Sequence, residues 1–492
     1  MLTHLRIQNF KSWRDTGQMR FAPLTGFFGP NSSGKSSILQ FLLMLKQTAE
    51  AHDQSQVLNL GLEQSAYVDL GTFSEILSSE SSESNISFEI EWLPDPYTFL
   101  ALVGHQFSPL EFQAEVPLAI DQPKPARFAP LHLDAQIGLV NDILVLKRLT
   151  VAYDAFRPFQ AALEWQGISQ HGKDYVYRFD YKLLASDGSM KAGNYTATIQ
   201  SMNLFVMSLW GLRQGSSGET SSNHMDQDSS EAVTGIQNVR FSFTMLVDKI
   251  DYLGPLREVP NRLYLWRGSA IDKVGLKGEQ SIQALLSREF THSSNGADSY
   301  HAIEWVVSWL KRLGLIHSFE ISKIAEGRRE YEVVVRQSPE GPLVLLTNVG
   351  FGVSQVLPVL VLCALAEEGS TIIFEQPEIH LHPAVQAGLA DVFIDVVKTR
   401  HIQIILESHS EHLLIRLQRR MAEERLMPED VALYFTRIED GESKLEELQI
   451  DQYGNISNWP ENFFGDRLGD LVAMTEAAMN RQISQPVNGT SG

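Results

Sequence analysis

One loop sequence sets the architecture of this chain: Gly29-Pro30-Asn31-Ser32-Ser33-Gly34-Lys35-Ser36. It matches the pattern G-x-x-x-x-G-K-[ST] of a phosphate-binding P-loop. Residues 24–28 are suited to the end of a buried strand, and residues 37–45 have the apolar spacing of a helix. In this strand–loop–helix setting, inward-pointing backbone N–H groups and the helix N-terminus bind phosphate. We therefore expect the loop, with Ser37 after it, to bind a nucleotide.

Two side chains of the loop have expected roles of their own. Lys35 is expected to reach the β- and γ-phosphates, and the Ser36 hydroxyl to bind Mg²⁺. The expected cofactors are therefore ATP and Mg²⁺.

Composition limits the classes of function. The chain has 492 residues, of which 43% are hydrophobic and 20% charged, and this is typical of a globular protein with two or three structural units. Its net charge of −20 disfavours broad binding to nucleic acid, which needs a dense basic face. The single cysteine, Cys363, excludes an intrachain disulfide and a multi-thiolate metal site. The sequence has no apolar signal region and no membrane-length apolar run, so we expect a cytoplasmic protein without membrane contact.

The chain divides into four predicted parts. Residues 1–92 form a first lobe with the P-loop, and residues 93–241 form a β-rich insertion with short alternating runs, such as 110–116 and 175–184. A polar segment near 214–234 is expected to be disordered. Residues 242–438 form a second lobe and residues 439–492 a tail.

The second lobe carries the other half of a nucleotide site. Residues 371–375 read as a buried strand ending in Glu375, followed by Gln376 and Glu378. A carboxylate at the end of the strand beside the P-loop strand is where Mg²⁺ is held, so Glu375 takes the Walker B position. Upstream, a glycine-rich turn with Gly350, Gly352 and Ser354 opens a helix; downstream, strand 402–406 leads to His409.

This order of motifs resembles the ABC-type ATPase heads of the SMC, RecF and OLD group. The resemblance implies an α/β fold, a P-loop NTPase of the ABC-ATPase-head type with a β-rich insertion. It also implies that two subunits enclose ATP, so the expected assembly is a homodimer or a higher even oligomer. By position, Gly350, Gly352 and Ser354 resemble the signature that binds the γ-phosphate of the other subunit, and His409 resembles the switch histidine.

Four segments narrow the resemblance to prokaryotic AAA/OLD-like ATPases with a C-terminal domain of unknown function. They are residues 252–257, 375–383, 407–412 and the tail at 450–464. Relatives of this kind occur in anti-phage defence systems, which implies a separate effector or nuclease as partner.

One residue departs from the family pattern. ABC-type heads usually place a glutamate general base after the Walker B acid, but here that residue is Gln376. Glutamine can orient a water but does not accept its proton. We therefore expect an ATPase with slow turnover, or one in which Glu378 or Glu407 serves as base.

Several alternatives stay open. The chain can be an ATP-dependent scaffold with little turnover, or an ATPase of DNA ends and DNA repair. A nuclease within the chain is disfavoured because no D-x-D pair follows His409 on an apolar strand. A transition-metal site at the histidines of 380–412 is disfavoured because the ABC-type motifs account for them. Arg257 and Arg262 can contact a phosphate or the opposing subunit, or form surface ion pairs.

Overall fold

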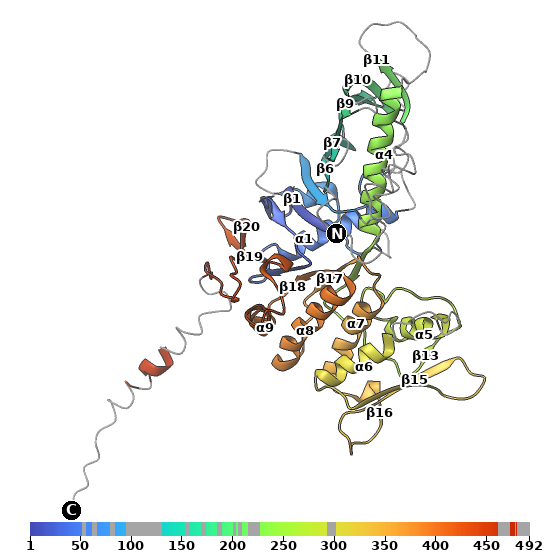
Figure 1. Cartoon of the computed structure of the whole chain (residues 1–492), viewed down its shortest axis with the longest axis vertical. Helices are drawn as coiled ribbons and strands as arrows, with labels where there is room; N and C mark the ends of the chain where they lie inside the picture. Colours follow the sequence, from blue (N-terminus) through green and yellow to red (C-terminus); the bar gives the residue numbers. More distant parts are fainter. Residues whose placement is uncertain are drawn as a thin grey trace, which may run out of the picture.

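The computed structural model describes residues 1–51, 56–61, 66–78, 84–94, 130–153, 158–168, 174–184, 189–199, 203–204, 209–214, 227–292, 302–460, 473–477 and 479. Within these residues the chain forms three β-sheets, with helices packed around them. Figure 1 shows the long antiparallel sheet with helix α4 (Gln227–Asp248) beside it at the top, and a helical lobe with α5 to α8 at the bottom.

The central sheet carries the P-loop. Its strand order is β12-β17-β18-β4-β19-β20; the first five strands are parallel, and β20 is antiparallel to β19. These strands are β12 (Ile250–Leu253), β17 (Thr371–Glu375), β18 (Gln403–Glu407), β4 (Leu24–Phe28), β19 (Val431–Glu439) and β20 (Glu442–Glu447). The carboxyl ends of the parallel strands meet at one edge, and the P-loop follows β4 at this edge.

The strand order corrects one expectation. The sequence pattern places Glu375 at the end of the strand beside the P-loop strand, but β18 lies between β17 and β4. The crossover through helix α8 (Pro383–Arg400) returns the chain to the sheet on the side of β17 that faces β4. Glu407, the last residue of β18, is therefore one strand nearer to the P-loop than Glu375.

The two faces of this sheet contribute to different hydrophobic cores. Ile373 and Ile405 belong to the core shared with the antiparallel sheet, whereas their neighbours Phe374 and Ile404 belong to the core of the helical lobe. Side chains alternate between faces along a strand, so both faces of β17 and β18 need apolar residues. This explains why both strands appear in the sequence as continuous apolar runs.

The second sheet joins the first lobe to the β-rich segment. Its order is β11-β10-β9-β8-β7-β6-β5-β1-β2, with β3 paired to β1. These strands are β1 (Leu2–Phe10), β2 (Trp13–Asp15), β3 (Met19–Arg20), β5 (Asn85–Trp92), β6 (Leu131–Val140), β7 (Ile143–Tyr153), β8 (Phe159–Ile168), β9 (Tyr175–Leu184), β10 (Met190–Ile199) and β11 (Leu209–Gln214). The expected run at 110–116 lies outside the described residues. Strands β6 to β11, which lie within the predicted insertion at 93–241, thus extend the sheet that β1 begins.

Helix α1 (Lys35–Glu50), which follows the P-loop, packs against this second sheet. The ring of Phe41 lies 5.3 Å from that of Phe10 and 5.2 Å from that of Phe88, both edge-on. These fully buried aromatic contacts anchor α1 to the second sheet, and they therefore fix the helix that follows the P-loop.

Part of the segment expected to be disordered is helical. Helix α4 begins at Gln227, so the expectation is wrong for residues 227–234; residues 215–226 lie outside the described residues. The helix buries Ala232, Ile236, Val239 and Phe243 at intervals of three and four. The polar composition before Thr234 masked this periodicity.

The helical lobe covers the other face of the P-loop sheet. It contains α5 (Ser281–His292), α6 (Ala302–Arg312), α7 (Phe351–Leu365), α8 and α9 (Glu411–Ala422). A small sheet packs on it, with β13 (Tyr264–Leu265), β14 (Ser318–Lys323), β15 (Glu330–Arg336) and β16 (Val344–Leu345). Short 3-10 turns occur at Phe73–Ile76, Leu346–Asn348 and Pro428–Asp430. Along the described part of the chain, no helix has the length and apolarity needed to cross a membrane.

We expect Gln403→Leu to destabilise the protein, because Gln403 connects the two large sheets. Its amide donates to Leu2 O at 2.8 Å and Ala22 O at 3.1 Å, and its oxygen accepts from Leu2 N and Thr371 Oγ1, both at 3.1 Å. Leucine would leave these buried groups without partners, so the free energy of unfolding should fall by about 3 kcal/mol in chemical denaturation. Gln160→Leu, at an exposed position of β8, is the control and should change it by less than about 0.5 kcal/mol. Equal effects of the two variants would contradict this role of Gln403.

Candidate functional site

The P-loop forms a concave turn between β4 and α1. Gly29, Ser32 and Gly34 have φ values of 138°, 60° and 96°. These left-handed conformations turn successive backbone N–H groups towards one side, which is the arrangement that binds phosphate. Helix α1 begins at Lys35 directly after Gly34, so its N-terminus faces the same turn.

Side chains distant in sequence hold this turn in shape. Thr436, on β19, donates to Phe28 O at 3.1 Å and its hydroxyl also pairs with that of Ser33. Trp13, on β2, is fully buried and its indole N–H donates to Gly34 O at 3.0 Å. We call Trp13 and Thr436 the loop clamp. Sequence reasoning missed both residues, because nothing in the motif points to them.

Lys35 is buried within its own loop. Its Nζ donates to Pro30 O at 2.6 Å and to Gly29 O at 3.1 Å, and the residue is only 2% exposed. Burial lowers the pKa of Lys35, while the nearby carboxylates of Glu407 and Glu378 oppose this shift. The ammonium group is thus already located where the phosphates are expected.

The ends of β17 and β18 bring several predicted residues to the loop. Ser36 Oγ donates to Glu407 Oε2 at 2.7 Å, and Gln376 Nε2 is 3.5 Å from Glu407 Oε1. Gln376 has a φ of 43°, and its backbone N–H donates to Glu407 O at 2.9 Å. The predicted Walker B neighbour Gln376 and the P-loop Ser36 therefore meet at Glu407.

Glu375, the register partner of Glu407 on β17, has further neighbours on β12 and after it. It lies within hydrogen-bonding reach of the Tyr252 hydroxyl on β12 and near the Arg257 guanidinium. Burial, reinforced by the charge of Glu407, raises the pKa of Glu375 to about 7. Arg257 is itself buried, which lowers its pKa to about 10, and both of its Nη atoms are without a hydrogen-bond partner among the described residues. The surface ion pair considered for Arg257 is thus excluded.

His409 lies between the P-loop and the acids. Its Nε2 is buried, is 4.0 Å from Glu407 Oε1, and has no hydrogen-bond partner among the described residues. Burial and the charge of Lys35 lower the pKa of His409, so the imidazole is neutral at neutral pH. Glu378 Oε1 accepts the His409 backbone N–H at 2.6 Å, and burial raises the pKa of Glu378. The predicted switch histidine is therefore fixed by the predicted acid Glu378.

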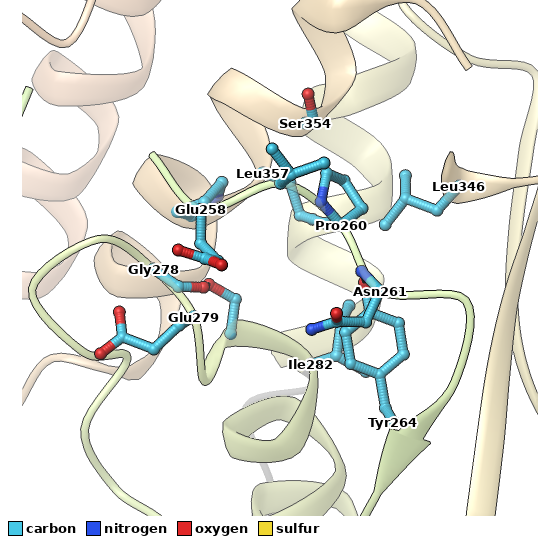
Figure 2. A pocket seen from close by; sticks show the side chains of 13 residues that line it. Glu258, Pro260, Asn261, Tyr264, Gly278, Glu279, Ile282, Leu346, Ser354 and Leu357 are labelled. Carbon is cyan, nitrogen blue, oxygen red and sulfur yellow. Dashed lines mark hydrogen bonds between the residues drawn. The ribbon is translucent and has the colours of Figure 1, made fainter. Parts of the chain in front are cut away.

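The three signature residues lie at the start of α7, and their environments differ. Gly350 is the N-cap of the helix and is exposed, and Gly352 is half-buried. Ser354 is buried and its hydroxyl donates to Phe351 O at 2.8 Å. It borders a pocket that also contains Glu258, Glu279 and Asn261 (Figure 2). The carboxylates of Glu258 and Glu279 disfavour an anion in this pocket. Of the three predicted signature residues, Gly350 and Gly352 are therefore the ones that a phosphate bound by another subunit can reach.

The donor set at Ser36 suits Mg²⁺. Hydroxyl and carboxylate oxygens are the ligands this ion prefers, and it normally takes one or two carboxylates together with substrate phosphates. Ser36 and Glu407, which are in contact, supply such oxygens, and the ion would neutralise charge on the phosphates. Within the described ranges, no group of three or more His, Cys, Asp or Glu side chains is arranged to hold a metal.

Comparison with known proteins agrees with this geometry. The family model described as "AAA ATPase domain" matches residues 1–117 and 279–414, slightly more than half of the chain. The chain belongs to this ATPase family. A second model, described as "Protein of unknown function (DUF3696)", matches residues 426–474 of this ATPase. The predicted membership of an AAA-type ATPase family with a C-terminal domain of unknown function is thereby confirmed.

Solved structures give a general likeness to SMC heads. An SMC head bound to the C-winged helix domain of ScpA is 12% identical, with 92% of this chain and 98% of that chain covered and a TM-score of 0.42. The SMC head domain from Thermotoga maritima is 11% identical, with coverage of 91% and 99% and a TM-score of 0.37. The head from Pyrococcus furiosus, bound to the C-terminal domain of ScpA, is 11% identical, with coverage of 97% and 99% and a TM-score of 0.40. No curated protein matches the chain in sequence.

The predicted fold class is correct. The ATPase has an α/β P-loop fold, in which one strand separates the P-loop strand from the strand that ends at Glu375 and a β-rich insertion extends the antiparallel sheet.

We expect Gly29→Ala to abolish tight ATP binding, because an added Cβ would lie 2.3 Å from Thr436 O in the loop clamp. Relieving this overlap has to move the loop away from β19. The affinity for ATP, measured by calorimetry, should fall by roughly tenfold or more. Gly17→Ala is the matched control: Gly17 also has a positive φ, of 66°, but its Cβ would meet nothing within 4 Å. Unchanged affinity in Gly29→Ala would show that the clamp does not set the loop's shape.

Proposed function

We propose that this ATPase is a nucleotide-dependent switch that binds ATP with Mg²⁺, closes as a homodimer and hydrolyses ATP slowly. The observation that carries the proposal is the state of Lys35. Its buried ammonium is held by the loop's own carbonyls, Gly29 O and Pro30 O. Phosphate oxygens are stronger acceptors for an ammonium than neutral carbonyls, because charge-assisted hydrogen bonds are about twice as strong as neutral ones. A triphosphate entering the loop would therefore take over these hydrogen bonds.

His409 supports the sensing part of the switch. A neutral imidazole with a buried, unpartnered Nε2 beside the P-loop is suited to a hydrogen bond with a γ-phosphate oxygen. Because Glu378 holds its backbone, a shift of His409 would be transmitted to the turn after β17. Loss of the γ-phosphate would break this connection.

Gln376 supports slow turnover. Its amide can orient the attacking water, while Glu378, one alternative base, already accepts the His409 N–H. This arrangement also favours a second candidate function, an ATP-dependent scaffold in which the nucleotide holds two subunits together with little hydrolysis.

The exposed start of α7 supports closure between two subunits. Gly350 and Gly352 present the helix N-terminus without bulky side chains or a side-chain cap, and a γ-phosphate from a second subunit would meet the N–H groups of the first turn there. An exposed Phe351 lies beside them, with its ring 5.4 Å from that of His380 on the turn after β17. The signature turn is thus in contact with the segment that follows the Walker B strand.

The cellular setting of the switch is proposed from the family resemblance. We place it in the cytoplasm, in an anti-phage defence system beside a separate effector or nuclease. The net charge of −20 disfavours the alternative role at DNA ends. Co-purification of the full chain from its native host tests this setting through the identity of the protein recovered with it.

Substitution of Lys35 and Gln376 should separate binding from turnover. Lys35→Ala should lower the affinity for ATP by roughly tenfold or more, since a charge-assisted hydrogen bond contributes about 1.5–3 kcal/mol. Gln376→Glu should raise turnover by roughly tenfold or more, because a positioned general base contributes about 10²–10⁴ in rate. Lys398→Ala, exposed at the end of α8, is the control. Normal binding and turnover by Lys35→Ala would overturn the proposed ATPase site.

Closure should be visible as a change in mass. Light scattering of the full chain should report a dimer with ATP and Mg²⁺ and a smaller species with ADP. Gly350→Asp places a carboxylate at the exposed α7 terminus, so it should prevent ATP-dependent dimerisation while ATP binding by the P-loop persists. A dimer of the same size in all nucleotide states would favour the scaffold instead.

A further inference from the structure

The carboxylate nearest to the P-loop comes from a strand that the Walker pattern does not include. Glu407 ends β18 and is paired in register with Phe27 of the P-loop strand on one side and with Glu375 on the other. In the order of the sheet, Glu407 therefore lies on the strand next to the P-loop strand, whereas the predicted Walker B acid, Glu375, lies one strand further away.

Glu407 is held at the metal-binding hydroxyl. Its Oε2 accepts from Ser36 Oγ at 2.7 Å, and its Oε1 is 3.5 Å from Gln376 Nε2. The side chain is only 3% exposed. A buried carboxylate is costly unless charge and hydrogen bonds compensate it, and here the Lys35 ammonium supplies part of that charge.

Glu375 is turned towards different partners. Tyr252, within hydrogen-bonding reach of its carboxylate, lies on β12, which borders β17 on the side away from the P-loop. Arg257, which follows β12, adds a positive charge near Glu375. The contacts of Glu375 are thus with Tyr252 and Arg257, while Glu407 is in direct contact with Ser36.

The separation of the two oxygens fits a shared cation. Mg²⁺ binds six oxygens in an octahedron at about 2.1 Å, so adjacent ligands lie about 3.0 Å apart. Ser36 Oγ and Glu407 Oε2 are 2.7 Å apart before any cation is bound, so a small adjustment makes them neighbouring ligands.

We propose that Glu407, together with Ser36, is the protein's carboxylate ligand for the Mg²⁺ that arrives with ATP, and that Glu375 lies outside the coordination sphere. This inference rests on the proposed function, because the cation is expected to enter with the nucleotide. The metal-binding role expected of Glu375 on β17 is thereby assigned to Glu407 on the neighbouring strand β18.

The test compares Glu407→Gln with Glu375→Gln in the full chain, with Mn²⁺ as a spectroscopic probe for Mg²⁺. Electron paramagnetic resonance measures Mn²⁺ binding in the presence of a non-hydrolysable ATP analogue, and fluorescent ATP measures nucleotide affinity in Mg²⁺ and in EDTA. Glu407→Gln should weaken Mn²⁺ binding by roughly tenfold or more, as loss of groups at a metal site typically does, and should remove the effect of Mg²⁺ on ATP affinity. Glu375→Gln should keep both within about threefold of wild type.

Each outcome decides the inference. Loss of Mn²⁺ binding in Glu375→Gln, or wild-type Mn²⁺ binding in Glu407→Gln, overturns it. If Glu407→Gln does not fold by thermal melting, Glu407→Asp replaces it: the shorter side chain should weaken Mn²⁺ binding while ATP affinity in EDTA stays that of wild type. Unaltered Mn²⁺ binding by Glu407→Asp also overturns the inference. Failure of the proposed function has a separate signature, since wild-type protein would then bind no ATP in either buffer.

Discussion

The nucleotide site depends on the register of three parallel strands. Phe27, Glu407 and Glu375 are paired in line across β4, β18 and β17, so the turns that follow these strands begin at one level. A slip of one residue would move Glu407 to the opposite face of the sheet and break its contact with Ser36. Burial on both faces prevents the slip, because Ile404 and Ile405 belong to separate cores. The pattern of apolar residues along β18 thus determines that Glu407 lies beside Ser36.

Much of the site was predictable from local sequence patterns. The P-loop, the strand that ends at Glu375 and the strand before His409 are short contiguous segments, and each contains its own structural signal. Buried parallel strands read as apolar runs, and glycine is the residue that most readily takes left-handed positions, as at Gly29 and Gly34 of the P-loop. These signals depend only on residues close in sequence, so they can be recognised without knowledge of the tertiary structure.

What the sequence did not reveal depends on long-range packing. The hydroxyls of Ser33 and Thr436 pair across 403 positions of the chain, and nothing near either residue indicates the other. The position of β18 between β17 and β4 follows from a crossover, which the strand sequences do not specify. Ser354 fits the expected signature by spacing, but the helix buries it against its own backbone.

The described residues leave several buried polar atoms without hydrogen bonds at this edge of the sheet: both Nη atoms of Arg257, Oε2 of Glu378 and Nε2 of His409. Each such atom costs about 1–3 kcal/mol of stability. Elsewhere in the described residues, Gln403 is well satisfied, whereas single atoms such as Thr150 Oγ1 and Ser370 Oγ also have no partner. The unsatisfied donors of Arg257 and His409 are set apart by their surroundings, because they lie near the acids at the ends of β17 and β18. Oxygen acceptors of a bound nucleotide that reached the donors of Arg257 and His409 would offset their part of this cost, so the same groups that weaken the free protein favour the nucleotide-bound state.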